Sequence, residues 1–365
     1  MDPRDRARLI ARELGSVLPR SVDFLGHERD WTPWSGRGLR RLGEVALDEM
    51  VLTGMTLTSP PPRVRTEVAE LPRITAELAE LGTAGCYRQP EPLRVKRVRR
   101  RLTGPLAFEE IRYQHDPRLP AVFGELGRPT TAVVNVVRHP GGPRPWLIWV
   151  HGAGQGNLTD FAVARVGRIH RELGYNIAMP IQPGHGVRRR WPPTYPDLDP
   201  VGNVAGMMRA VSEVRAVTRW VAPQAEAVAL SGLSLGTGVV ALAAGLEDDV
   251  DGVALYTPIF GLNSMIAAHL HRWGAAADEV TALLSAPEVA ALTGVIDPLS
   301  LEPRVPAEHR MIVGAWSDRM AMRAPAQALH ERWGGRLFWH DGSHVGQLMS
   351  GRVQAITEAF LAGLR

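Results

Sequence analysis

The sequence predicts an α/β protein with a doubly wound, mostly parallel sheet, and three observations carry this prediction. From about residue 91 onward, strand-like runs alternate with helical stretches, which is typical of right-handed βαβ units. Trp146–Val150 is nearly continuously apolar, as expected of a strand that is buried on both faces. Ala227–Ser231 is a second apolar run, and it leads through Gly232-Leu233-Ser234-Leu235-Gly236 into an apolar helical stretch. That order predicts a buried strand, a very tight turn and a helix.

The length and the composition of the chain limit the class of protein to which it can belong. With 365 residues and 45% hydrophobic content, the chain can hold a large core with additions. No run approaches the roughly 18 apolar residues that span a bilayer, and Met1–Arg6 lacks the apolar core of a signal peptide. The single cysteine, Cys86, has no internal disulfide partner. We therefore expect a cytoplasmic protein without stable membrane insertion.

The charge pattern does not predict a nucleic-acid partner. The formal charge is +4, and the pI is about 9.7 because the basic residues are almost all arginine, with Lys96 the sole lysine. Basic runs occur at 96–101 and 188–190, but neither accompanies a recognisable binding module. The first run alternates like the exposed face of a strand.

The sequence pattern of residues 1–90 predicts a helical N-terminal extension. A helix is expected over Pro72–Leu81, with Leu71, Ile74, Leu78 and Leu81 on one face and Gly82 as its stop. This extension could shape the functional site, form a contact in a homo-oligomer, or serve only as a structural appendage.

The predicted core runs over residues 91–258 and 304–365, with an interruption at 259–303. Helices are expected over 158–172 and 201–221. Residues 259–303 carry helical segments with no strand between them. The expected strands are 93–101, 107–113, 132–137, 146–150, 175–180, 227–231, 252–256, 310–315 and 337–340.

The G-x-S-x-G turn at Gly232–Gly236, in its strand and helix context, resembles the nucleophile elbow of the α/β-hydrolase superfamily. The two glycines allow a sharp turn and a close approach of strand and helix. Ser234 would stand at the tip of the turn, where the first N–H groups of a helix favour developing negative charge. The resemblance implies that Ser234 is the nucleophile, and that the insertion at 259–303 is a helical lid.

His151–Asn157, directly after the Trp146–Val150 run, resembles the oxyanion turn that follows the third strand of these hydrolases. The resemblance implies that the N–H groups of Leu235 and Ala153, or alternatively Gly154, stabilise an oxyanion. A phosphate-binding loop is the rival interpretation, but the lysine of the G-x-x-x-x-G-K-[ST] motif is absent. His151 is expected to support the loop.

The superfamily order requires an acid and then a histidine after Ser234. Asp318 follows the predicted strand 310–315, and His344 lies in a short loop between the last strand and a terminal helix. The resemblance implies that they are the acid and the base of a triad. The alternatives are Asp297 and Asp341 for the acid, and His340 for the base.

Three further positions are candidates for contact with the substrate. They are Gly154, His185 in Pro183-Gly184-His185-Gly186, which resembles a loop of superfamily esterases and lipases, and Met265 in the insertion. Leu270 and Trp273 could line an acyl pocket with Met265. Alternatively, His185 stabilises its loop, and the three apolar side chains pack the insertion against the core.

The expected function is that of a serine hydrolase acting on a small-molecule or lipid-like ester, or a related acyl bond, through an acyl-enzyme. No cofactor and no metal are implied. Because Ser234 replaces the carboxylate that epoxide hydrolases and dehalogenases of this fold use, neither of those reactions is expected. Acyl transfer and C–C bond hydrolysis use the same triad and remain alternatives, as does a non-catalytic binding protein that retains the fold.

Overall fold

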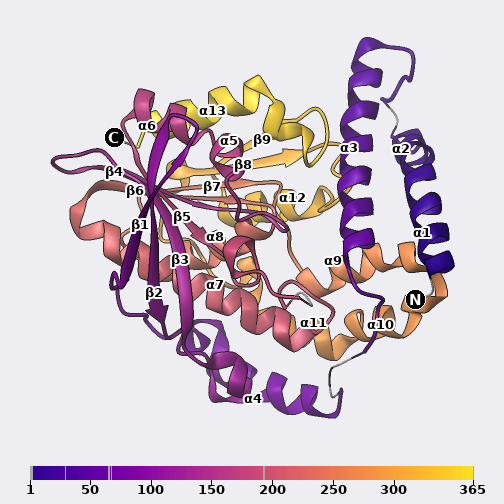
Figure 1. The fold of residues 1–365 in the computed structure, drawn as a ribbon, viewed down its shortest axis with the longest axis horizontal. Coiled ribbons are helices and arrows are strands. Elements are labelled where there is room, and N and C mark those ends of the chain that lie inside the picture. Colours follow the sequence, from indigo (N-terminus) through magenta and orange to yellow (C-terminus); the bar gives the residue numbers. More distant parts are fainter. Residues whose placement is uncertain (1–2, 29, 65, 67, 192–193, 365) are drawn as a thin grey trace.

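The computed structural model of this chain describes residues 3–28, 30–64, 66, 68–191 and 194–364. In that part of the chain, nine strands form one sheet in the order β1-β2-β3-β5-β4-β6-β7-β8-β9 (Figure 1). Pairs from β1 to β5 in this order are antiparallel, and pairs from β5 to β9 are parallel. This arrangement confirms the mostly parallel sheet. The strands are β1 (Arg97–Thr103), β2 (Leu106–His115), β3 (Thr130–Val137), β4 (Arg144–Val150), β5 (Asn176–Ile181), β6 (Ala225–Leu233), β7 (Gly252–Tyr256), β8 (Arg310–Ala315) and β9 (Arg336–His340).

Helices cover both faces of the sheet, so the fold is doubly wound. In Figure 1, α13 lies above the sheet and α7 lies below it. α7, α8 and α12 contribute to the apolar cluster on one face, and α5, α6 and α13 contribute to the cluster on the other. The helices are α1 (Pro3–Gly15), α2 (Val17–Gly26), α3 (Gly36–Thr58), α4 (Leu71–Cys86), α5 (Asp160–Val163), α6 (Val166–Leu173), α7 (Pro200–Val221), α8 (Leu235–Leu246), α9 (Leu262–His269), α10 (Asp278–Leu284), α11 (Pro287–Thr293), α12 (Ala324–Trp333) and α13 (Gly351–Ala362).

The central strand β4 shows why these residues form a buried strand. Trp146 and Ile148 pack into the cluster with α7 and α8, whereas Leu147 and Trp149 pack into the cluster with α6 and α13. Successive side chains of a strand point to opposite faces, and both faces are covered here. A continuous apolar run is therefore required at this place.

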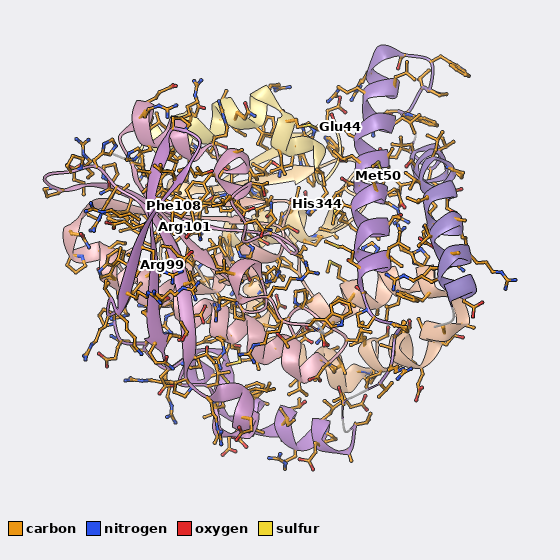
Figure 2. The ribbon with its side chains drawn as sticks, viewed as in Figure 1. Glu44, Met50, Arg99, Arg101, Phe108 and His344 are labelled. Carbon is orange, nitrogen blue, oxygen red and sulfur yellow. The ribbon has the colours of Figure 1, made fainter. Side chains whose placement is uncertain are left out.

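β1 begins later than the sequence predicts. Leu93 is buried in the main core, and its N–H donates to the carbonyl of Ala216 on α7 at 3.0 Å, so this residue does not join the sheet. From Arg97 to Leu102 every residue of β1 is exposed, so the predicted alternation of an exposed face does not occur. Figure 2 shows Arg99 and Arg101 on this outer part of the sheet.

Two predicted helices differ in detail. The predicted helix over 158–172 is divided into α5 and α6, because Arg165 has φ 51° and interrupts the helical backbone. Gly82 does not end its helix as predicted. With φ 65° and ψ 164° it interrupts α4 locally, but helical turns resume and continue to Cys86.

The predicted N-terminal extension is divided between two places in the structure. Leu71, Ile74 and Leu78 of α4 pack into the main core, as their predicted apolar face requires. In contrast, α1, α2 and α3 form an upright group beside the end of the sheet that carries β8 and β9 (Figure 1). This second group reaches the loops that follow β8 and β9, through hydrogen bonds of α3.

The insertion between β7 and β8 carries α9, α10 and α11 with short 3₁₀ turns, and the described residues 257–309 contain no strand. Among the described residues, no single helix has both the length and the apolarity to cross a bilayer; the segments Leu262–Leu284 and Pro287–Ile296, bent by 60°, satisfy that test only as a pair. Their buried apolar residues are divided between the main cluster, which holds Val289 and Leu292, and a smaller cluster within the insertion.

Candidate active site

Ser234 stands at a strained turn between β6 and α8. Its backbone has φ 52° and ψ −117°, a conformation that residues with a side chain rarely adopt. A Cβ on Gly232 would lie 2.6 Å from the carbonyl oxygen of Gly236, and one on Gly236 would lie 2.7 Å from that of His151. The two glycines therefore allow the close approach that the turn requires.

His344 and Asp318 form a buried acid–base pair. The Nδ1 atom of His344 lies 2.8 Å from Oδ2 of Asp318, and the side chains are 5% and 1% exposed. The other oxygen of Asp318 accepts hydrogen bonds from the backbone N–H groups of Met320 and Ala321, at 2.9 and 2.7 Å. These contacts fix the carboxylate so that it can orient the imidazole.

The electrostatic surroundings favour the charged form of His344. Burial alone lowers the pKa of this imidazole, but the charge of Asp318, the hydrogen bond to it and the charge of Asp48 outweigh burial. Together they raise the pKa of His344 above its ordinary value of 6.5. Asp318 therefore stabilises the imidazolium that would form when His344 takes up a proton.

The parallel sheet brings the three predicted residues to one edge. Ser234, Asp318 and His344 follow the carboxyl ends of β6, β8 and β9, which are parallel strands of one sheet. Ligand sites of open α/β sheets lie at this edge. Among the described residues, a hydrogen bond joins His344 to Asp318, and none joins Ser234 Oγ to His344. In ligand-free enzymes such contacts often tighten only with substrate.

The loop after β4 packs directly against Ser234. A Cβ on Gly152 would lie 3.2 Å from the Cβ of Ser234, so this turn borders the serine. The N–H of Gly152 donates to Oε1 of Gln155 at 2.6 Å, and Oδ2 of Asp160 accepts from the N–H groups of Gly156 and Asn157 at 2.7 and 3.1 Å. These contacts fix the loop from within.

The predicted oxyanion donors lie on the two segments that meet at Ser234. Leu235 is the first residue of α8, where a backbone N–H has no acceptor within the helix. Ala153 is half-buried and follows Gly152 in the adjacent loop, and Gly154 is exposed with φ 76°.

His151 and His185 are both held by their own loops. Nδ1 of His151 donates to the carbonyl of Gly152 at 2.8 Å, and its Nε2 accepts from the N–H of Gln182 at 3.0 Å. Burial lowers the pKa of His151 to about 3, so the ring is neutral. His185 is 4% exposed, donates from Nδ1 to the carbonyl of Pro183 at 2.8 Å, and lies 5.0 Å from the His151 ring. These contacts stabilise the loops, and a contact of His185 with substrate stays a prediction.

The alternative acids and base have other partners. His340 donates from Nε2 to Glu44 at 2.9 Å. Asp341 accepts from Arg37 and Arg40, and the hydrogen bond from Arg37 is the main cause of its lowered pKa. Asp297 accepts from the backbone N–H of Leu299 at 2.9 Å.

The apolar candidates of the insertion mostly pack the insertion itself. Leu270 is 6% exposed within a small cluster that also holds Ala267 and Val280, and Trp273 packs against that cluster. Met265 is half-buried and packs against the main core. Arg188, in the basic run 188–190, is largely buried and pairs with Glu213 at 2.6 Å. Its guanidinium therefore does not face solvent and is not free to bind an anionic substrate.

Sequence reasoning missed the contribution of α3. Asp48 and Glu44 of this helix accept hydrogen bonds from the loop that carries His344. Figure 2 shows Glu44 on α3 and His344 across the boundary between this helix and the sheet. The one local signal is their spacing of four residues, which places both carboxylates on one face of a helix. That spacing does not indicate a partner almost 300 residues away.

The sheet and its covering helices have the α/β-hydrolase fold. In the structural comparison, acetyl xylan esterase 1 from Thermoanaerobacterium sp. JW/SL YS485 is 16% identical with a TM-score of 0.52, and covers 84% of this chain and 96% of its own. An acetyl xylan esterase from Paenibacillus sp. R4 is 16% identical with a TM-score of 0.53, and covers 82% of this chain and 96% of its own.

The sequence comparison finds a relative over nearly the whole length. The uncharacterized protein Rv2627c of Mycobacterium tuberculosis is 30% identical over an alignment of 362 positions, which covers 93% of this chain and 86% of the relative. No protein-family model matches the sequence. The chain has the α/β-hydrolase fold and belongs to the same family as Rv2627c.

Proposed function

We propose that this chain is a serine hydrolase that cleaves a carboxylic ester, or a related acyl bond, through an acyl-enzyme. The observation that carries the proposal is the position of Ser234 on a strained turn, at the same sheet edge as the hydrogen-bonded pair Asp318 and His344. A serine needs a neighbouring base to act as a nucleophile at neutral pH, and a histidine oriented by a carboxylate supplies it.

The proposed reaction has two halves. Ser234 Oγ attacks the acyl carbon while His344 Nε2 takes the hydroxyl proton, and Asp318 keeps the other ring nitrogen, Nδ1, protonated and oriented. The bond to the leaving group then breaks, and His344 returns the proton to that group. Water attacks the resulting acyl-enzyme with His344 again as base, which releases the acid and restores Ser234.

The oxyanion formed in each half needs donors that are already in place. We assign this role to the N–H groups of Leu235 and Ala153, with Gly154 as the alternative to Ala153. Support comes from the position of Leu235 at the start of α8 and from the contact of Gly152 with Ser234. Donors that need no reorganisation each lower the barrier by about 2.7–4 kcal/mol.

The ester class is supported by the similar solved structures, both of which carry the name acetyl xylan esterase. We propose Met265, Gly154 and His185 as residues that border the substrate. A graded series of acetyl to decanoyl esters, with matched thioesters and amides, would measure the acyl length that the enzyme prefers.

Active-site labelling tests the proposal. A fluorophosphonate probe should label the native chain at one site and should not label Ser234→Ala. The native chain should also release free acid from an activated ester in a Ser234-dependent manner. Absence of labelling of the native chain, or equal labelling of both chains, would show that Ser234 is not an activated nucleophile. Transfer of the acyl group to an added alcohol, without release of acid, would make the enzyme an acyltransferase.

A further inference from the structure

Asp48 of α3 connects the loop of the acid with the loop of the base. Its Oδ2 accepts hydrogen bonds from the N–H of His344 at 3.0 Å and from the N–H of Arg319 at 3.2 Å. Its Oδ1 accepts from the N–H of Val345 at 2.9 Å and from the hydroxyl of Ser343 at 2.8 Å. One buried carboxylate therefore binds the backbone of His344 and of the residue after Asp318.

Glu44, one turn earlier on α3, holds the same loop from its other end. It accepts hydrogen bonds from the N–H of Ser343 at 3.0 Å and from Nε2 of His340 at 2.9 Å. A Cβ on Gly342 or Gly346 would collide with the carboxylate of Glu44. The loop that carries His344, called the base loop below, thus lies directly on the surface of α3.

The contacts of Asp48 suit the ionised form of its carboxylate. Three of its four partners are backbone N–H groups, and an ionised carboxylate is an acceptor only. The fourth, the hydroxyl of Ser343, shares its one proton between Asp48 and the carbonyl of Glu44, which lies 2.9 Å away. The side chain of Asp48 is fully buried, so each of the three N–H groups would lose its partner in a variant without the carboxylate.

We propose that Asp48 is a positioning residue, which fixes the loop that carries Asp318 relative to the loop that carries His344 and so makes the N-terminal extension part of the active site. The inference rests on the proposed function for its kinetic consequences. Asp48 does not contact the reacting atoms; it acts through the backbone of His344 and Arg319. A displacement of about 1 Å of a catalytic group can cost about 10²-fold in rate.

Charges on every side determine the electrostatic effect of Asp48. The titratable and charged groups near it come from three elements. They are Asp318 and Arg319 of the loop that carries Asp318 (the acid loop), His340 and His344 of the base loop, and Glu44, Glu49 and Arg41 of α3. Burial is the main cause that raises the pKa of Asp48 to about 6, and the charge of Asp318 acts in the same direction. The carboxylate is therefore charged above that pH. Its charge contributes to the raised pKa of His344.

Asp48→Asn tests the proposal, because the amide keeps the volume but loses the charge and half of the acceptors. We expect kcat for an activated ester to fall about 10²-fold with KM changed less than about twofold. We expect the acid limb of the pH profile of kcat/KM to move to lower pH. The pKa of the His344 imidazole, measured by NMR of ¹³C-labelled histidine with His344→Ala for assignment, should fall as well.

Glu13→Gln is the matched control. Glu13 is as buried as Asp48 and lies in the same N-terminal extension, but it pairs with Arg20 and Arg272 and touches neither loop. We expect native kinetics, pH profile and His344 titration for this variant. Equal losses in both variants would show that the extension is merely structural, and native kinetics and titration in Asp48→Asn would overturn the positioning role.

Two further measurements keep the outcome clear. If Asp48→Asn fails to fold, Ser343→Ala removes one of the four donors and should lower kcat about tenfold; a native rate would overturn the proposal. If the native chain is not labelled by a fluorophosphonate, the proposed hydrolase function fails. The NMR titration of His344 would still decide whether Asp48 acts on that histidine.

Discussion

Arg272 of the insertion and Glu49 of α3 form an ion pair at 2.6 Å in which both side chains are completely buried. Glu13 of α1 lies 3.5 Å from the same guanidinium, and Arg319 of the acid loop pairs with Glu49 at 2.7 Å. The insertion, the N-terminal extension and the acid loop therefore meet in one buried charged network.

Removal of Arg272 should destabilise the fold. Arg272→Ala leaves the carboxylates of Glu13 and Glu49 buried with one cation fewer, and the loss of one partner of a buried ion pair costs about 3–5 kcal/mol. Urea unfolding followed by circular dichroism measures the free energy of unfolding. Arg304→Ala is the control, because its pair with Asp248 is largely exposed and should contribute at most about 1 kcal/mol. A similar cost for both variants would refute the buried network.

Asp318→Asn should leave the fold intact and abolish most of the activity. Its amide cannot hold the Nδ1–H tautomer of His344, and the equivalent change in a serine protease triad lowers kcat about 10⁴-fold. Turnover of an activated ester measures the effect, and near-native unfolding curves verify the fold. Asp341→Asn is the control, since Asp341 pairs with Arg37 and Arg40 and should be dispensable. If Asp341→Asn were the inactive variant, the acid would be wrongly assigned.

The two glycines Gly236 and Gly238 of α8 should differ sharply in their response to alanine. A Cβ on Gly236 would lie 2.7 Å from the carbonyl oxygen of His151, in the backbone of the loop after β4. A Cβ on Gly238 would make only ordinary van der Waals contacts, with the Met207 side chain at 3.4 Å and the carbonyl oxygen of Ile259 at 3.9 Å. Gly236→Ala should therefore lose about 1–3 kcal/mol or more through overpacking.

Gly238→Ala should be neutral or stabilising, because alanine is the better helix former by about 1 kcal/mol. Thermal unfolding of the two variants makes the comparison. Equal stability of the two variants would show that the turn tolerates a side chain at Gly236. That result would contradict the close approach of α8 to the loop after β4.

The sequence could predict those parts of the fold that depend on local patterns. Gly252–Tyr256 and Arg310–Ala315 are strands with the predicted bounds, because their apolar runs are buried on both faces of the sheet. The turn at Ser234 was also predictable, since its glycines and its flanking strand and helix are adjacent in the chain. The contact of His344 with Asp318 followed from strand order at one sheet edge, once the superfamily resemblance was recognised.

The role of α3 could not be predicted in this way. Asp48 and His344 are 296 residues apart, and nothing in either local sequence indicates that they meet. The departure of Leu93 from the predicted strand has the same cause, because its N–H finds its acceptor on α7, more than 100 residues later. A pattern in the sequence specifies the conformation of a segment, whereas the partner of a buried polar group depends on the packing of distant elements.

The pH dependence of the reaction should identify the base. His344 must be neutral to accept the proton of Ser234, and its pKa is raised above 6.5 by Asp318 and Asp48. As the pH falls through this raised pKa, kcat/KM should fall tenfold per pH unit, so the acid limb should lie above pH 6.5. Burial lowers the pKa of both His151 and His185, so neither can produce a limb in that range. The profile of kcat/KM for a non-ionising ester between pH 5 and 9 measures the limb. The residual activity of Asp318→Asn should show the limb at lower pH, because the largest favourable charge is gone. An acid limb below pH 6.5 in the native chain, or one that does not move in Asp318→Asn, would mean that the pair of His344 and Asp318 does not control the reaction.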